Sequence, residues 1–261
     1  MSAGDLITGL LVREFEAAAR ADTPLRVLAA TSMASLVAGL TARAAGHDVA
    51  IAGGFAALDA DPIPSLSLGE SGLGIERSTR RGLFDTFSVL SRGWVGVAVS
   101  PGQLDGKART NLSFVGGTHN EPGVALPGSR GLAENNTSPS RVWYVVPRHT
   151  SRTLVGEVDF VSGPEPAGDA PRRLITNLGV FVYDGGWRAE SLHDGVAVTD
   201  VAENTGFPVD CSGSVVTPPI SEDELAAIAA IDPDDLRGLE AAPDLARMGE
   251  LIAAERKRLR G

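Results

Sequence analysis

The chain has 261 residues, and its 23 Lys and Arg against 33 Asp and Glu give a formal net charge of −10. A chain of this length buries a sizeable hydrophobic core. The acidic balance argues against a general nucleic-acid binder, which needs a basic face for the phosphates. The single cysteine, Cys211, excludes an internal disulfide framework and a cysteine-rich metal site.

The N-terminal third alternates between helix and strand patterns. Apolar periodicity and turn residues predict a helix over residues 2–19, a strand over 25–30, a helix over 33–45 and a strand over 48–52. Ser2 and Asp5 have the spacing of a capping box, and Gly46 follows the second helix at the expected end position. A strand, a helix and a strand joined by short connections predict a βαβ unit and therefore a parallel sheet.

The rest of the chain predicts further strands and a helical C-terminus. We expect a helix over 81–92, strands over 94–99, 142–146, 153–161, 174–183 and 187–192, and helices opening at Ser221 and over 243–260. Asp184-Gly185-Gly186 predicts a hairpin turn. The fold class is therefore α/β: a mostly parallel open sheet flanked by helices, with a later antiparallel hairpin region. Since no linker divides the chain, we expect one domain over 1–261 with a helical extension from about 221.

Two stretches, 53–81 and 111–139, are rich in glycine and lack periodicity. No phosphate-binding glycine motif and no Gly-x-Ser-x-Gly elbow occurs, and the four histidines are too scattered to predict a metal site. Loops at the carboxyl ends of parallel strands commonly bind ligands, and small residues there expose N–H groups that stabilise an oxyanion. These stretches are therefore either ligand-binding loops or ordinary surface turns.

A resemblance to a known family is carried by HTSRTLVGEVDFVSG (149–163), NLGVFVYDGGWRAESLHDGV (177–196) and VAENTGF (201–207). These segments resemble the β-type subunits of family I CoA-transferases, such as the glutaconate CoA-transferase β subunit. The resemblance is closer to the β-type subunit of the heteromeric CoA hydrolases that open the last steroid rings in actinobacteria. TSMAS (31–35), PGQLD (101–105) and GSRG (128–131) follow in family order, so the resemblance spans most of residues 25–235.

The resemblance places the usual catalytic glutamate at the end of the second core strand, where it attacks the acyl-CoA thioester. Here that strand reads DVAIAGGF, and Ala52 stands at the expected position. Glu70, within GESG (69–72), is an alternative nucleophile, although it lies 18 residues further on and is equally a solvated loop carboxylate. The steroid-ring hydrolases also lack this glutamate on the β side. The resemblance therefore implies that an α-type partner supplies the acid and that no residue of this chain is assigned as catalytic.

The resemblance also implies two groups of site residues. Gly128, Ser129 and Gly131 match the glycine-rich loop that borders the family's site and would hold an oxyanion through their N–H groups. Arg130 would hold an acidic acyl group, unless it is an ordinary surface arginine. The residues that follow and would line the same pocket are Glu134, Asn135 and Asn136.

A second set of polar residues is expected in the pocket or in structural roles. Gln103, Asp105 and Asn111 match another polar loop of the family, and turn-stabilising hydrogen bonds are an equally good reading of them. His149 and Arg152 match a His-x-x-Arg pair that precedes a core strand, for which we expect a structural role at the subunit contact.

The predicted function is the β-type subunit of a heteromeric enzyme that hydrolyses an acyl-CoA thioester or cleaves a ring or C–C bond hydrolytically. The implied partner is an α-type CoA-transferase subunit, in a heterodimer or heterotetramer. Coenzyme A thioester is the substrate, and no bound cofactor, metal, nucleic acid or membrane is expected. The alternatives are a true ping-pong CoA-transferase that uses a glutamate and a catalytically silent scaffold subunit. The N-terminus shows no cleavage signal and the chain no apolar run of about 18 residues, so we expect a cytoplasmic protein.

Overall fold

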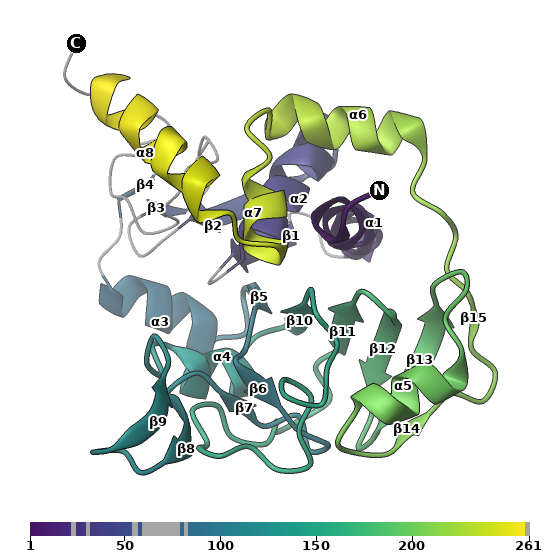
Figure 1. The fold of residues 1–261 in the computed structure, drawn as a ribbon. Coiled ribbons are helices and arrows are strands. Elements are labelled where there is room, and N and C mark those ends of the chain that lie inside the picture. Colours follow the sequence, from purple (N-terminus) through teal and green to yellow (C-terminus); the bar gives the residue numbers. More distant parts are fainter. Residues whose placement is uncertain (22–24, 30–31, 54–56, 59–78, 81–82, 259–261) are drawn as a thin grey trace. The chain divides into compact units, whose positions relative to one another are not determined.

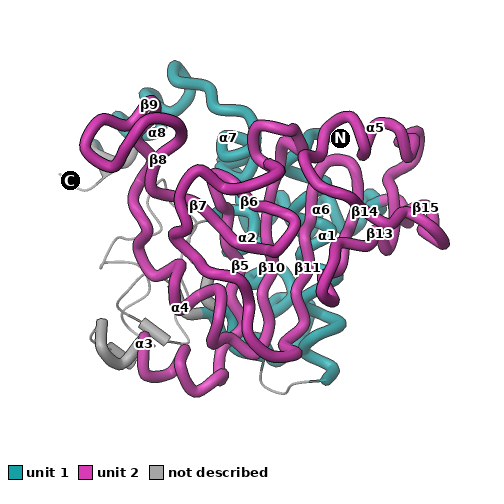
Figure 2. Tube along the Cα trace, turned by 90° about the horizontal axis from the view of Figure 1, so that it is seen from below, with its two compact units in different colours: residues 1–81, 220–261 teal, residues 82–219 magenta. Residues whose placement is uncertain are grey.

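In the computed structural model, residues 1–21, 25–29, 32–53, 57–58, 79–80 and 83–258 are described (Figure 1). The chain divides into two compact units, Met1–Arg81 with Ile220–Gly261 and Gly82–Pro219 (Figure 2). The expected single domain over 1–261 stays a prediction. Most of the glycine-rich stretch 53–81, including Glu70, lies outside the described residues.

The first unit is built on a short sheet with helices. Its strands are β1 (Leu25–Ala29), β2 (Val49–Gly53), β3 (Ala57–Leu58) and β4 (Thr79–Arg80). Its helices are α1 (Ala3–Ala21), α2 (Met33–Ala44), α6 (Glu222–Ile231), α7 (Leu236–Ala241) and α8 (Leu245–Arg258). Strands β1 and β2 pair in parallel with Leu25 opposite Val49, and α2 connects them, which confirms the predicted βαβ unit. Strand β3 pairs antiparallel with both β2 and β4.

Helix α1 forms where its sequence signals place it. Ser2 N–H donates to the Asp5 carboxylate and Asp5 N–H donates to Ser2 Oγ, both at 3.1 Å, which confirms the capping box. One face carries Ile7, Leu11 and Phe15, all completely buried. The four-residue spacing of these side chains produces one apolar stripe along the helix, and burying that stripe is the main source of its stability.

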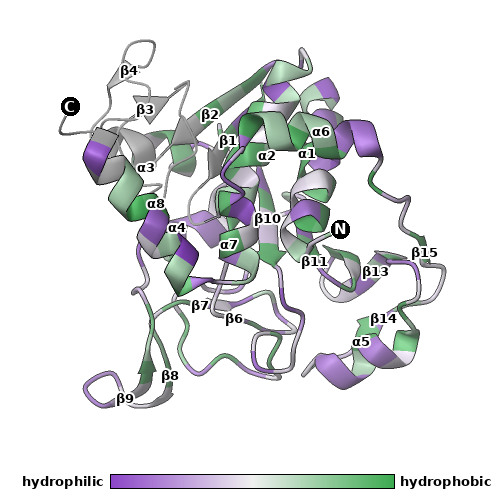
Figure 3. Ribbon diagram, turned by 45° about the horizontal axis from the view of Figure 1, so that its top comes forward, coloured by the Kyte–Doolittle hydropathy of each residue, from purple (hydrophilic) through white to green (hydrophobic). Residues whose placement is uncertain are grey.

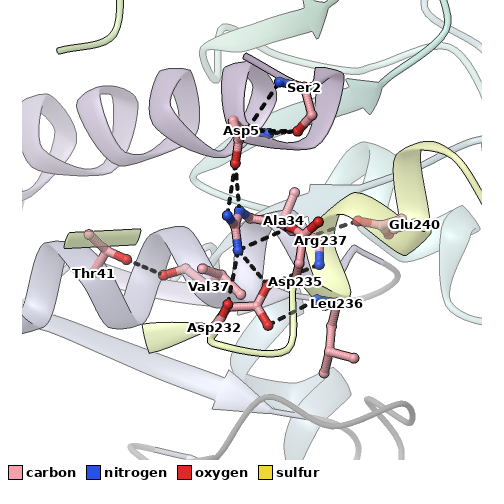
Figure 4. A network of polar contacts seen from close by, with 10 residues as sticks. All are labelled: Ser2, Asp5, Ala34, Val37, Thr41, Asp232, Asp235, Leu236, Arg237 and Glu240. Atoms are coloured by element: carbon pink, nitrogen blue, oxygen red, sulfur yellow. Dashed lines mark hydrogen bonds and ion pairs between the residues drawn. The ribbon is translucent and has the colours of Figure 1, made fainter. Parts of the chain in front are cut away.

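The C-terminal helices are bound into the first unit by charged side chains from α7, as Figure 4 shows. The Arg237 guanidinium donates to Asp5 on α1 and to Asp232, which directly follows α6. Glu240 accepts the N–H groups of Met33 and Ala34, at 3.0 and 2.9 Å, and so caps α2. Helix α6 opens with the predicted capping box between Ser221 and Glu224.

The second unit holds a larger mixed sheet. Its strands are β5 (Gly96–Val99), β6 (Gln103–Leu104), β7 (Thr110–Asn111), β8 (Phe114–Gly117), β9 (Pro122–Ala125), β10 (Arg141–Val146), β11 (Arg172–Thr176), β12 (Gly179–Tyr183), β13 (Trp187–Leu192), β14 (Val209–Asp210) and β15 (Val215–Val216). Its helices are α3 (Leu83–Ser91), α4 (Leu132–Thr137) and α5 (Val198–Asn204). Strands β5, β10 and β11 are parallel, and β11, β12 and β13 are antiparallel, so the predicted fold class is confirmed.

Hydrophobic residues concentrate on the central strands of this sheet, of which β10 is a clear example in Figure 3. Val142 and the four residues after it are all buried, and Tyr144 is completely inaccessible to solvent. A strand covered on both faces needs continuous apolar residues rather than alternation. No helix in the described ranges is long and apolar enough to cross a lipid bilayer.

Two strand predictions are wrong in part. Residues 153–161 form turns and irregular backbone instead of a strand, with a single bridge from Leu154 to Leu104. Their β-branched content is real, but only this one residue of the segment aligns with a neighbouring strand. The segment 174–183 holds two strands, because the chain turns at Asn177 and Leu178 between β11 and β12. The hairpin of β12 and β13 around Asp184-Gly185-Gly186 is confirmed.

Candidate functional site

The glycine-rich loop at residues 128–131 has an unusual backbone. Gly128 has a φ of +99° and Arg130 a φ of +47°, so a residue with a large side chain occupies the left-handed region. Gly128 N–H donates to the Leu112 carbonyl at 2.8 Å, so this amide is already used. Within the described ranges, no group accepts a hydrogen bond from the N–H of Ser129, Arg130 or Gly131. Of the three expected oxyanion donors, Gly128 is therefore ruled out and Ser129 and Gly131 remain, and the N–H of Arg130 is a further donor that was not expected.

A surface depression of about 450 Å³, wide open to solvent and called the cavity below, lies beside this loop, entirely within the second unit. Its walls come from the loop, from α4 and from one side of α3, and they are lined by Phe87, Ser88, Ser91, Arg130, Gly131, Ala133 and Glu134. The sequence predicted Arg130, Gly131 and Glu134 as pocket residues. It did not predict the α3 side chains, because nothing in the local pattern of 81–92 indicates what the helix faces.

The two asparagines that follow have different surroundings. Asn136 is 1% exposed, donates to the carbonyls of Ala108 and Pro164, and accepts from Tyr144 Oη at 2.6 Å. Its amide is thus fully engaged in holding segments of this unit together. Asn135 is also buried, and a Cβ added to Gly131 would lie 3.4 Å from its Oδ1. Asn135 therefore packs against the loop, whereas Asn136 is structural.

Gln103 and Asn111 face each other across β6 and β7, and both are buried. Asn111 Nδ2 donates to Gln103 Oε1 and to the Phe114 carbonyl, each at 2.7 Å. Gln103 Oε1 also accepts the N–H of Asp159 at 3.0 Å. These bonds are internal to the fold, so the geometry supports the turn-stabilising reading of both residues.

Asp105 is completely buried and has its carboxylate satisfied. It accepts the N–H groups of Lys107 and Arg109, at 3.0 and 3.1 Å, and the Arg109 Nε at 2.8 Å. These contacts close a tight turn in which Ala108 has a φ of +56°. Strand β7 follows this turn, and the next residue, Leu112, supplies the carbonyl that accepts the Gly128 N–H. Asp105 therefore stabilises the segment to which the glycine-rich loop is bonded.

The structure separates the two members of the His-x-x-Arg pair. His149 is buried, and Thr205 Oγ1, which donates to the Val201 carbonyl, lies 2.8 Å from its Nε2. The Nε2–H therefore donates to Thr205, and Nδ1 accepts from Thr176 Oγ1 at 3.0 Å. Burial lowers the pKa of His149 to about 4, which keeps the ring neutral at pH 7. Arg152 is exposed, and within the described part of the chain neither residue forms a hydrogen bond or ion pair with the glycine-rich loop.

The position of the family's glutamate is only partly described. The backbone of Ala52 lies in β2, opposite Leu28 of β1 and Leu58 of β3. The surroundings of its side chain and all of Glu70 lie outside the described residues. Across the part of the chain that is described, no group of three or more His, Cys, Asp or Glu side chains is arranged to hold a metal ion.

Comparison with known sequences identifies close relatives, although no family model matches the chain. The IpdB subunit of the cholesterol ring-cleaving hydrolase from Rhodococcus jostii (strain RHA1) is 36% identical over 169 residues, which is 59% of this chain and 66% of that one. The IpdB subunit from Mycobacterium bovis is 33% identical over 225 residues, which is 80% of this chain and 88% of that one.

Comparison with solved structures supports the same relationship. The decarboxylase AibA/AibB matches with a TM-score of 0.79 and 29% identity, covering 91% of this chain and 97% of that one. The Rhodococcus jostii RHA1 IpdAB structure matches with a TM-score of 0.71 and 27% identity, covering 91% and 97%. Glutaconate coenzyme A-transferase from Acidaminococcus fermentans matches with a TM-score of 0.77, covering 89% and 95%, but at 16% identity it supports the fold alone.

Proposed function

The chain belongs to the family of the IpdB subunits of ring-cleaving hydrolases and has the CoA-transferase fold, and from this premise we propose its role. It is the β-type subunit of a heteromeric enzyme that cleaves a carbon ring hydrolytically in a steroid-derived acyl-CoA thioester. The observation that carries the proposal is the similarity to an IpdB subunit across 88% of that subunit's length.

The catalytic acid or base comes from an α-type partner in this proposal. Ala52 offers only a methyl group at the position where the resembling transferases carry their glutamate. A methyl group neither attacks a thioester nor moves a proton. The partner's carboxyl group therefore activates the water that attacks the ring carbonyl, and this chain contributes binding and orientation.

The glycine-rich loop supplies the polar part of that contribution. The N–H groups of Ser129, Arg130 and Gly131 have no acceptor among the described residues, so they are free to stabilise a developing oxyanion. One such donor is typically worth about 10²–10³ in rate. The buried amide of Asn135 packs behind the loop and restricts its movement. Coenzyme A enters as part of the substrate and not as a resident cofactor.

The test is to express the chain with the α-type subunit encoded beside it and to supply a ring-bearing steroid-derived acyl-CoA in water labelled with heavy oxygen. We expect the two-chain assembly to produce a ring-opened product that has gained one labelled water, at a rate neither chain reaches alone. Equal turnover by this chain alone would overturn the proposal. A glutamyl adduct trapped by hydroxylamine would instead identify a transferase, and release of carbon dioxide a decarboxylase.

The loop's part in this chemistry has its own test. At Gly131 an added Cβ would lie 3.3 Å from the Phe87 ring and 3.4 Å from Asn135 Oδ1, so the branched side chain in Gly131→Val crowds these neighbours of the loop. We expect turnover of the assembly to fall by about 10²-fold, the value of one oxyanion donor. Gly186→Ala is the matched control, because an added Cβ there meets nothing within 4 Å. Unchanged turnover in Gly131→Val would favour a scaffold role for the chain.

A further inference from the structure

Arg130 occupies a backbone conformation that its side chain does not favour. Its φ of +47° lies in the left-handed region, which glycine adopts at least cost and which other residues adopt with strain. Glycine is abundant in this loop, with Gly128 and Gly131 on either side. An arginine held in this conformation at the wall of a cavity indicates a use for the side chain, because the backbone alone would be better served by glycine.

The Arg130 guanidinium has no anionic partner in the part of the chain that the structure describes. Within the described ranges, no Asp or Glu forms an ion pair with it. Among the described residues, Glu134 is the only carboxylate in the cavity wall, and one of its oxygens accepts from Ser138 Oγ at 2.8 Å. Arg130 is therefore an exposed cation that lines the cavity without an ion-pair partner among the described residues, on a chain whose net charge is −10.

The other described residues of the cavity wall combine apolar and hydroxyl-bearing side chains. Phe87 presents an aromatic ring and Ala133 a methyl group. Ser88 and Ser91 add hydroxyl groups from α3, although Ser91 Oγ also donates to the Ser88 carbonyl at 3.3 Å. A planar guanidinium beside hydroxyl groups is the chemistry that binds carboxylate and phosphate oxygens.

We propose that this cavity binds an anionic group of the acyl-CoA substrate, a carboxylate or a phosphate, with Arg130 as the specificity-determining residue. The inference rests on the proposed function, because it takes the ligand to be an acyl-CoA. The negative charge of Glu134 repels the same anionic ligand, so Arg130 raises the affinity for it and Glu134 lowers that affinity.

Calorimetric titration of the two-chain assembly tests this with probes of stated charge. Adipoyl-CoA and hexanoyl-CoA have acyl chains of equal length and differ in the terminal carboxylate, and the 3′-dephospho form of each removes one phosphate. Arg130→Gln should weaken binding by about tenfold, since charge-assisted hydrogen bonds to an exposed arginine are worth about that much. Glu134→Gln should tighten binding several-fold, and Arg188→Gln, on an exposed arginine of β13, is the control without effect.

The pattern across probes identifies the anion. A loss confined to adipoyl-CoA assigns the acyl carboxylate, and an equal loss with both esters that disappears in the dephospho forms assigns the 3′-phosphate. Unchanged affinity of Arg130→Gln for every ester that the unaltered assembly binds overturns the inference while leaving the proposed function intact. Failure of the unaltered assembly to bind any of the esters counts against the proposed function instead.

Arg130→Gly separates binding from a structural role. Because glycine suits the left-handed backbone, this variant should keep or raise the melting temperature while losing the same affinity as Arg130→Gln. A lower melting temperature in Arg130→Gly would show that the side chain supports the fold, and it would overturn the assignment to ligand binding.

Discussion

Arg237 is the residue whose removal should most damage the first unit, and Arg237→Ala tests how the C-terminal helices are held. Its side chain is 7% exposed and bonds to Asp5 at 2.8 and 3.1 Å and to the Asp232 carboxylate at 3.0 Å. Asp232 is only 1% exposed, so truncation leaves a buried carboxylate with two backbone N–H donors, those of residues 236 and 237, and no counter-charge. Removing one partner of a buried pair costs about 3–5 kcal/mol.

The lower end of that range is the better expectation, because Asp5 is 21% exposed and regains water when Arg237 is lost. We therefore expect a loss of about 3 kcal/mol in the free energy of unfolding, measured by urea denaturation followed by circular dichroism. The matched control is Arg247→Ala, whose exposed pairs with Asp234 and Glu250 are worth about 0–1 kcal/mol.

The difference between the unaltered chain and Arg237→Ala should also depend on pH. Burial opposes ionisation of Asp5, but hydrogen bonds from Arg237 and Ser2 outweigh it and lower the pKa of Asp5 below its ordinary value. A carboxyl group with a lowered pKa stabilises the fold above its unfolded pKa and loses that contribution as the pH falls through the folded value. The stability difference should therefore shrink under acid. A loss no larger than that of Arg247→Ala, or one that stays constant into acid, would refute this reasoning.

Three further predictions concern other described contacts. Hydrogen bonds from Arg13 lower the pKa of Glu224 to about 2, so Arg13→Ala should reduce the free energy of unfolding at pH 7 and lose that effect as the pH falls from about 4.5 toward 2. In Gly163→Ala the new Cβ would overlap the Thr110 hydroxyl and lie 2.9 Å from the Leu132 carbonyl oxygen, so we expect the free energy of unfolding to fall by about 1–3 kcal/mol. In the control Gly249→Ala, on α8, the new Cβ meets nothing within 4 Å, and the free energy of unfolding in the same urea denaturation assay should rise by up to about 1 kcal/mol. Since burial lowers the pKa of His149 to about 4, the chain should lose stability as the pH falls from about 6.5 to 4, and His149→Gln should show a weaker pH dependence in unfolding measured across that range.

Local signals in the sequence were sufficient for several elements. The capping boxes at Ser2 and Ser221 start helices where they were predicted, because an N-cap hydrogen bond involves only residues three positions apart. The turn at Asp184-Gly185-Gly186 and the βαβ unit around α2 are equally local, and both formed as expected. The segment 153–161 failed as a strand because β propensity has no effect without a partner strand in register.

The sequence predicted only those residues of the candidate site that lie close to one another along the chain. Arg130, Gly131 and Glu134 are close in sequence, and a resemblance to the family's loop was enough to select them. Their relation to α3 depends on how segments roughly forty residues apart fold together, and no local pattern encodes that distance.

The amino-acid sequence by itself determined the family, the fold class and the absence of a nucleophilic side chain at Ala52, since these follow from residue identity and short-range order. Only the tertiary structure decided which polar residues are free to act. It engaged Gln103, Asp105 and Asn111 in internal hydrogen bonds, and it left Arg130 at a cavity without an ion-pair partner among the described residues. The physical reason is that a polar side chain buried in the fold must find its partners there, whereas one that faces a cavity keeps its hydrogen-bonding capacity for a ligand.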